Sequence, residues 1–108
     1  MSAYRKGLRE QAAKRLALAQ RFYDRAESRI VMGLPTYGEF DPLTDKRNMG
    51  TEGGEEVLDS GNYLKFSEQM RPDLSLFLQK MRAKTIVLYG MWEQLEEMMR
   101  TPKREGDA

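Results

Sequence analysis

Four carboxylates lie within eight residues in the middle of this chain: Glu52, Glu55, Glu56 and Asp59. In a helix, side chains three and four residues apart lie on one side, so Glu52, Glu56 and Asp59 form a line with Glu55 beside it. Carboxylates placed in this way can share one hard cation. The spacing therefore indicates a candidate cation site on a helix.

Large apolar side chains continue the same line in both directions: Met49 before the acids, then Tyr63, Phe66 and Met70 after them. An apolar line predicts a face that contacts protein, where a carboxylate is costly unless it is paired or bound to a metal. We interpret this acid seam as the core of a cation-binding site. The alternative is a solvated acidic face that reflects the ordinary preference for acids at a helix start.

The chain has no cysteine and no histidine. This excludes disulfides, thiolate catalysis, catalytic triads that use histidine, and zinc sites built from cysteine or histidine. The remaining metal ligands are carboxylate oxygens, which suit magnesium, manganese or calcium.

A second pair of acids, Asp24 and Glu27, lies one helical turn apart in the preceding predicted helix. If that helix packs antiparallel to the next one, its C-terminal part lies beside the acid seam. Asp24 and Glu27 are then predicted to join the acids of residues 52–59 around one small volume, where an uncompensated cluster would repel itself.

Several residues near the acids are candidates for substrate binding. Asn62 could hydrogen-bond a base or sugar, or it could equally tie two helices together. Basic side chains flank the acidic centre and could meet phosphates, and a loop aromatic, Tyr37, could stack on a nucleobase. The basic candidates are Lys46, Arg47 and Lys65. By contrast, the acids at positions 93, 96 and 97 fall off any apolar seam and are predicted to be solvated.

The elements that must position these residues are all helical. Apolar residues at steps of three and four predict a first helix from Tyr4 to about Met32, with Gly33 as a plausible C-cap and Pro35 as a further stop. Residues 33–48 are predicted to be a connection. A second helix is expected to start between Asp45 and Thr51, capped by Asp45 or Asn48.

Pro72 disfavours helix at the residue before it, so the second helix is predicted to end near Arg71. The third is expected from about Asp73 to Arg100. Its seam steps by four and three, and it is apolar enough to suggest a subunit interface. Three glycines in the second helix, at positions 53, 54 and 61, indicate close contact with another backbone or a ligand. The seam residues are Leu74, Leu78, Met81, Thr85, Leu88, Trp92, Leu95 and Met99.

A chain of 108 residues is long enough for one small domain. The predicted fold class is all-α: a bundle of about three helices per chain, completed by oligomerisation. The domain is expected to span residues 1–100, followed by a disordered tail at 101–108. A net charge of +1 gives no overall field for nucleic acid or membrane, and without a signal peptide or membrane-spanning run we expect a cytoplasmic protein.

The stretch YGEFDPLTDKRNMGTEGGEEVLDSGNYLKF resembles the all-α nucleoside triphosphate pyrophosphohydrolases of the MazG-like and dimeric dUTPase-like superfamily. That family carries ExxE on one helix and ExxD on the next. Here residues 56–59 match ExxD and are followed by Asn62, while residues 52–55 add an ExxE to the same helix. Residues 24–27, a DxxE, are the nearest equivalent of the first motif.

The resemblance implies a dimeric or tetrameric helical bundle that uses magnesium, or manganese, to hydrolyse nucleoside triphosphates to monophosphate and pyrophosphate. Under this hypothesis the metal is held by Glu52, Glu56 and Asp59, with Glu27 or Asp24. Glu55 or Glu52 orients the attacking water. The alternative function is a non-enzymatic helical module for oligomerisation or binding.

Overall fold

A computed structural model describes residues 2–102, apart from the side chain of Tyr37. Three α-helices and one short 3-10 turn account for its regular structure, and no strand occurs within the described residues, so the all-α prediction is confirmed. The chain divides into two compact units, Met1–Asp45 and Lys46–Ala108, and each is described by itself. A single domain over residues 1–100 stays a prediction.

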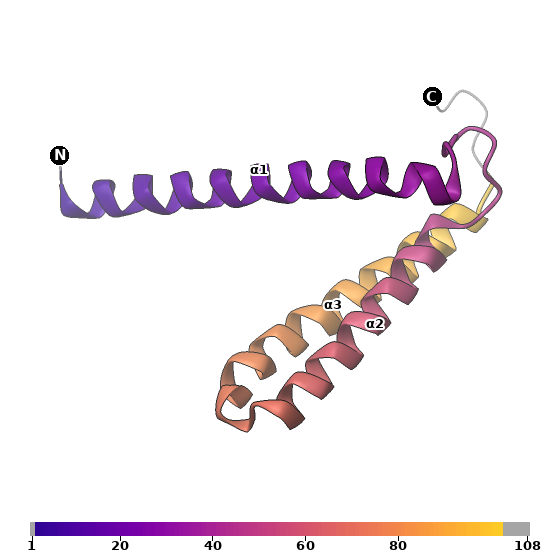
Figure 1. The fold of residues 1–108 in the computed structure, drawn as a ribbon. Helices are drawn as coiled ribbons and strands as arrows, with labels where there is room; N and C mark the ends of the chain where they lie inside the picture. Colours follow the sequence, from indigo (N-terminus) through magenta and orange to yellow (C-terminus); the bar gives the residue numbers. More distant parts are fainter. Residues whose placement is uncertain (1, 103–108) are drawn as a thin grey trace. The chain divides into compact units, whose positions relative to one another are not determined.

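The first unit consists of one long helix, α1 (Ala3–Tyr37), and the loop that follows it (Figure 1). Ser2 caps its N-terminus, because its hydroxyl accepts a hydrogen bond of 3.2 Å from the Arg5 backbone N–H. The large apolar side chains of α1 are exposed, including Leu16 at 72% and Ile30 at 67%. The apolar stripe predicted from the sequence is present on the helix but lies open.

The end of α1 corrects the sequence prediction. The helix runs through Gly33 and Pro35 and ends at Tyr37, with Gly38 as its C-cap. Gly38 has a φ of 74°, in the left-handed region that glycine enters easily, and its N–H donates to the Leu34 carbonyl at 2.9 Å. Pro35 is tolerated because, in the last turn, it removes only one hydrogen bond of the helix.

The connection is therefore shorter than predicted and begins at Gly38. Asp41 organises its middle: its carboxylate accepts from the Leu43 N–H at 2.9 Å, and its carbonyl accepts from the N–H of Asp45 at 3.0 Å. Such Asx turns are a usual way for aspartate to fix a loop.

The second unit is a helical hairpin of α2 (Met49–Met70) and α3 (Ser75–Arg100), joined by the 3-10 turn η1 (Pro72–Leu74) (Figure 1). These bounds confirm the predicted start of the second helix, its end before Pro72 and the end of the third helix at Arg100. Asn48, one of the two predicted caps, is the N-cap of α2. The predicted disordered tail lies, from residue 103 onward, outside the described residues.

The core of the hairpin is small and lies between α2 and α3. Its buried apolar side chains are Val57 and Leu64 from α2 and Leu78 from α3. Gly50 and Gly54 are also buried. Steps of three and four connect these α2 positions, so this glycine-containing stripe is the face of α2 that packs on α3.

The acid seam therefore does not pack on α3. Met49 and Glu52 are half-buried, whereas Glu56, Asp59 and Tyr63 are exposed, Tyr63 at 70%. The reason is physical: the glycines let α3 approach closely, whereas burial of the acid seam would remove the hydration of several carboxylates. The sequence prediction that this seam faces protein does not hold within the hairpin.

The seam predicted for α3 is rotated slightly from the one that packs. Leu78, Thr85 and Trp92 belong to both, but Leu88 is 46% exposed and Met81 41% exposed. Ser75, Arg82, Tyr89 and Glu96 complete the inward stripe. No helix among residues 2–102 is long and apolar enough to cross a membrane.

Candidate functional site: the acidic face of α2

The acidic face of α2 occupies the first three turns of a helix of 22 residues. Glu52 lies in the first turn and is half-buried; Glu55, Glu56 and Asp59 are exposed. A helix N-terminus carries a partial positive charge, which favours a carboxylate at Glu52. Glu56 and Asp59 are open to a ligand from outside the hairpin, whereas Glu55 lines a hollow that α2 shares with Tyr89, Glu93 and Glu96 of α3.

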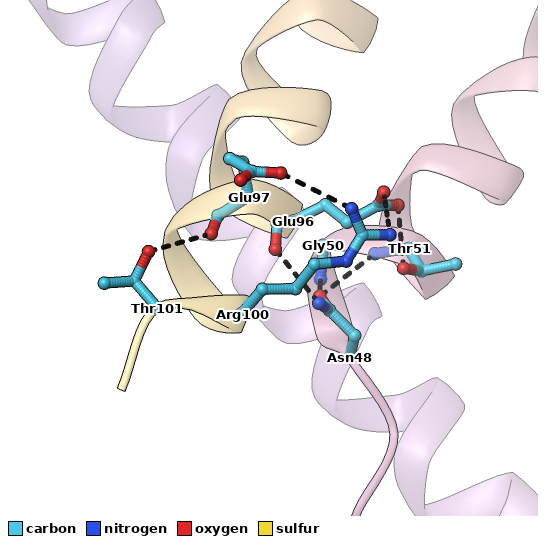
Figure 2. A network of polar contacts seen from close by, with 7 residues as sticks. All are labelled: Asn48, Gly50, Thr51, Glu96, Glu97, Arg100 and Thr101. Atoms are coloured by element: carbon cyan, nitrogen blue, oxygen red, sulfur yellow. Dashed lines mark hydrogen bonds and ion pairs between the residues drawn. The ribbon is translucent and has the colours of Figure 1, made fainter. Parts of the chain in front are cut away.

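A network of hydrogen bonds holds this end of α2 to the last turn of α3 (Figure 2). The Asn48 side-chain oxygen accepts from the Gly50 N–H at 2.9 Å, while its amide nitrogen donates to the Glu96 backbone carbonyl at 3.0 Å. Asn48 therefore caps α2 and ties it to α3 with one side chain.

Glu96 is the centre of the network on α3. Its carboxylate accepts from the Thr51 hydroxyl at 2.7 Å and from Arg100 Nη2 at 2.7 Å (Figure 2). We call Asn48, Thr51, Glu96 and Arg100 the clasp. Because Asn48 and Thr51 of the clasp lie at the start of α2, the clasp fixes the backbone from which the Glu52 and Glu55 side chains project.

Two glycines let the helices meet beside the clasp. A Cβ atom built on Gly50 would lie 2.5 Å from the Glu96 Cα, and one on Gly53 would lie 2.5 Å from the Trp92 ring. Such distances are far inside van der Waals contact. Of the three glycines predicted to meet another backbone or a ligand, Gly53 has a close contact, but with the Trp92 side chain, and Gly54 is in ordinary contact with Trp92. Gly61 has open space instead.

Sequence reasoning missed both Gly50 and the structural role of Glu96. Glu96 was predicted to be solvated, but its side chain is only 28% exposed and bridges two helices. A signal was present: Glu96 continues the steps of three and four from Leu78 through Thr85 and Trp92, so it lies on the inward stripe. Arg100, four residues later, is placed to pair with it.

The other predicted acids lie in the first unit. Asp24 and Glu27 are exposed on α1, one turn apart, and Asp24 accepts a hydrogen bond of 3.0 Å from the Gln20 side chain. Their predicted meeting with the acids of α2 stays a prediction. Within residues 2–102, no three histidine, cysteine or acidic side chains converge closely enough to hold a metal ion.

The predicted substrate-binding residues are spread around α2. Lys46 and Arg47 lie in the loop before the helix, and Lys65 is exposed in its later turns. Tyr37 belongs to the last turn of α1 and not to a loop as predicted. Asn62 lies at the edge of a groove of about 320 Å³ between the two helices. The groove is lined by Val57, Leu58, Gly61, Asn62, Thr85, Ile86 and Tyr89.

Two carboxyl groups with lowered pKa values, Glu68 and Asp73, lie at the other end of the hairpin, near the turn. The Arg82 guanidinium donates a hydrogen bond to Glu68 and lowers the pKa of that carboxyl. Arg71 likewise lowers the pKa of Asp73 through a hydrogen bond of 2.6 Å. These pairs fix the turn and are distant along α2 from the acidic face.

Comparisons of this chain with known protein families, with curated proteins and with solved structures give no match.

Proposed function

We propose that the protein hydrolyses nucleoside triphosphates to monophosphate and pyrophosphate with magnesium or manganese, on the acidic face of α2. The observation that carries the proposal is the placement of Glu52, Glu55, Glu56 and Asp59. Glu52, Glu56 and Asp59 project from successive turns of α2, whose packing face is held to α3, and Glu55 lies on the flank beside α3. A fixed row of carboxylates suits the work of holding a cation against phosphates.

The donor set fits the proposed metal in its chemistry. All four candidate ligands present carboxylate oxygen, which hard divalent cations prefer, and the sequence has no competing histidine or cysteine. Glu52, Glu56 and Asp59 are the proposed ligands. They do not converge on one point in this structure, so their side chains would have to turn toward the ion, which would neutralise phosphate charge when bound. The second set of ligands suggested by the family resemblance, Asp24 and Glu27, remains part of the hypothesis.

Glu55 or Glu52 has the proposed role of proton acceptor. The carboxylate takes a proton from the attacking water as its oxygen bonds to the α-phosphorus. The bond from that phosphorus to the bridging oxygen breaks, and pyrophosphate leaves. Neither histidine nor cysteine is required for this step, which agrees with their absence from the sequence.

The first prediction concerns Asp59. We expect pyrophosphate release from at least one nucleoside triphosphate in the presence of Mg²⁺, and a loss of at least about 100-fold in Asp59→Asn, since one metal-binding charge is removed. The assay is a panel of nucleoside triphosphates with coupled pyrophosphate detection. The matched control is Glu10→Gln, an exposed acid of α1 outside the proposed site, which should keep full activity.

Two results would contradict this function: wild-type protein inactive on every triphosphate, or Asp59→Asn as active as wild type. Melting curves with and without Mg²⁺ add a test that needs no substrate, because a ligand that binds the folded state raises the melting temperature.

A second candidate function is a helical module without catalytic activity, which acts by oligomerisation or binding. The observation that favours it is the apolar surface of the hairpin. Its buried apolar side chains are Val57, Leu64 and Leu78, while many large ones on α3 are open. For this candidate, Mg²⁺ should leave the melting temperature unchanged.

A further inference from the structure

The positive charge of this chain is concentrated on α1. The whole chain has a net charge of +1, but α1 carries eight basic and three acidic side chains, which gives this helix a net charge of +5. Residues 46–102, by contrast, carry eight basic and nine acidic side chains. A near-neutral total therefore conceals one strongly basic helix, and cations gathered along a helix are the electrostatic footprint of a surface that binds a polyanion.

Three arginines of α1 form a line along the helix. Arg21, Arg25 and Arg29 are four residues apart, so they lie on one side. We call these three residues the basic line. Each step of four residues advances about 6 Å along the axis, so the basic line extends over about 12 Å. This length is enough to follow several successive phosphates of one nucleic-acid strand.

The acids of α1 leave the basic line unpaired. Glu27 lies two residues from Arg25, which places it on the opposite side of the helix. Asp24 lies beside the line, but its carboxylate accepts a hydrogen bond of 3.0 Å from Gln20, which is farther round the helix. The side chains of the basic line are exposed and make no hydrogen bond or ion pair with any other part of residues 2–102. Their guanidinium groups are thus available to phosphate oxygens.

An exposed aromatic ring lies beside the basic line. Phe22 is 65% exposed and contacts the Tyr23 ring in an edge arrangement, with 5.5 Å between the ring centres, which restricts its movement. Phe22 and the basic line share a hollow of about 310 Å³, whose lining Leu18 and Ala26 complete. Guanidinium groups around an exposed ring offer contacts to phosphates and, between them, a surface on which a planar base can stack.

From these features we infer that α1 binds single-stranded nucleic acid along the basic line, with a base stacked on Phe22. Arginine suits phosphate because its planar guanidinium donates two parallel hydrogen bonds. An unpaired strand fits better than a duplex, because its bases can turn a free face to the Phe22 ring, whereas the bases of a duplex stack on each other. This binding requires no hydrolytic activity and is compatible with either candidate function.

An anionic membrane surface fits α1 less well, because the helix has no single wide apolar face. Leu18 and Phe22 lie among the arginines, whereas Leu16, Tyr23 and Ile30 form a stripe nearly opposite the basic line. A helix that lies in a membrane interface has its apolar side chains on one face and its charges on the other. Because the two sides of α1 are nearly opposite, a protein contact on the apolar stripe would leave the basic line open.

The test measures binding of the full chain to a fluorescein-labelled oligodeoxythymidine of about 20 nucleotides by fluorescence anisotropy, at about 50 to 200 mM salt. Replacing Arg21, Arg25 and Arg29 together by glutamine should raise the dissociation constant at least about 10-fold. It should also reduce the slope of log affinity against log salt by about 2, since each phosphate contact to a single strand contributes about 0.7.

The matched control also removes three charges from α1, but from another side of the helix: Arg5→Gln, Lys6→Gln and Arg9→Gln together. It should leave the dissociation constant within about threefold. Phe22→Leu separates stacking from charge. It should weaken binding about fivefold or more and leave the salt slope unchanged, because it removes a stacking surface and no charge.

Circular dichroism shows whether each variant stays helical, as the good helix propensity of glutamine and leucine predicts. If the triple variant of the basic line loses its helix, Arg25→Gln takes its place, with an expected change in slope of about 0.7 and Arg9→Gln as its control. Wild-type protein that does not bind the strand would overturn the inference. So would equal weakening by the control, an unchanged affinity in Phe22→Leu, or equally tight binding to a duplex, to phosphatidylserine vesicles or to polyglutamate.

Discussion

The two ends of the α2–α3 hairpin are held together by different chemistry. At the open end, the clasp joins the helices through Asn48 and Glu96, and Gly50 lets the backbones approach closely. At the turn end, the chain itself connects the helices, and Arg82 pairs with Glu68, which also accepts a hydrogen bond from Ser75 at 3.3 Å. At the open end the helices are joined by backbone contact and neutral-donor hydrogen bonds, and the Glu96–Arg100 ion pair lies within α3; at the turn end an ion pair crosses between the two helices.

The difference between the two ends shows which end holds its side chains in the more strictly defined geometry. At the open end, no covalent connection joins α2 to α3. The candidate carboxylates nevertheless lie there, on the first three turns of α2. Backbone contact and hydrogen bonds fix distance and angle, whereas a partly exposed ion pair tolerates movement. The end with the stricter geometry is thus the end from which Glu52 and Glu55 project.

The largest effect is expected where backbone contact is closest. Gly50→Ala places a Cβ against the backbone of Glu96, which cannot rotate away, and should destabilise the hairpin by about 1–3 kcal/mol. Gly61→Ala is the matched control: nothing lies within 4 Å of its Cβ position, so the better helix propensity of alanine should stabilise by up to about 1 kcal/mol.

Urea unfolding at one fixed protein concentration measures both glycine variants, because association would otherwise shift the apparent stability. Opposite signs for the two substitutions would support the contrast between the contacted and the open glycine. A Gly50→Ala variant as stable as wild type would show that the helices do not meet at the open end.

A smaller effect is expected from the clasp side chains. Asn48→Ala removes the cap of α2 and the hydrogen bond to the Glu96 carbonyl, and should cost about 1–2 kcal/mol. Asn48→Asp separates these roles, since aspartate still caps but has no amide to donate. Hydrogen exchange of the α2 amides is the measurement. Equal protection of the first turn in both variants and wild type would argue against the clasp.

Much of this architecture was visible in the sequence, and the missed parts share a cause. Pro72, Asn48 and the periodic apolar residues act locally, so the bounds of α2 and the end of α3 were predictable. The sequence did not show whether the acid seam or the glycine-containing stripe of α2 packs on α3, because that depends on which face α3 meets. Gly50 and Glu96 gain their roles only from that contact. At the end of α1, the helix continues past Pro35 to Tyr37, and Gly38 is its C-cap.

The placement of Glu52, Glu56 and Asp59 along one side of a single helix was predictable, because spacing alone determines it. The surroundings of these acids were predicted wrongly, since the seam is exposed on the hairpin and not packed against α3. Local periodicity places side chains on a helix, and only tertiary contact decides which side of the helix is covered.

The smallest effect is expected at the turn end and depends on pH. Because Arg82 lowers the pKa of Glu68 in the folded chain, the pair stabilises the fold above the ordinary pKa of a glutamate. This contribution is lost as the pH falls through the lowered folded-state pKa. Glu68→Gln should therefore make the melting temperature fall less steeply as the pH is lowered. Under more acidic conditions, where the wild-type carboxyl is already protonated, the substitution should change the melting temperature little. Thermal melts of both proteins from neutral to acidic pH measure the difference, and Glu93→Gln, an exposed acid of α3, is the control. If the two variants follow the same curve, Glu68 makes no special contribution and geometry, not charge, holds both ends of the hairpin.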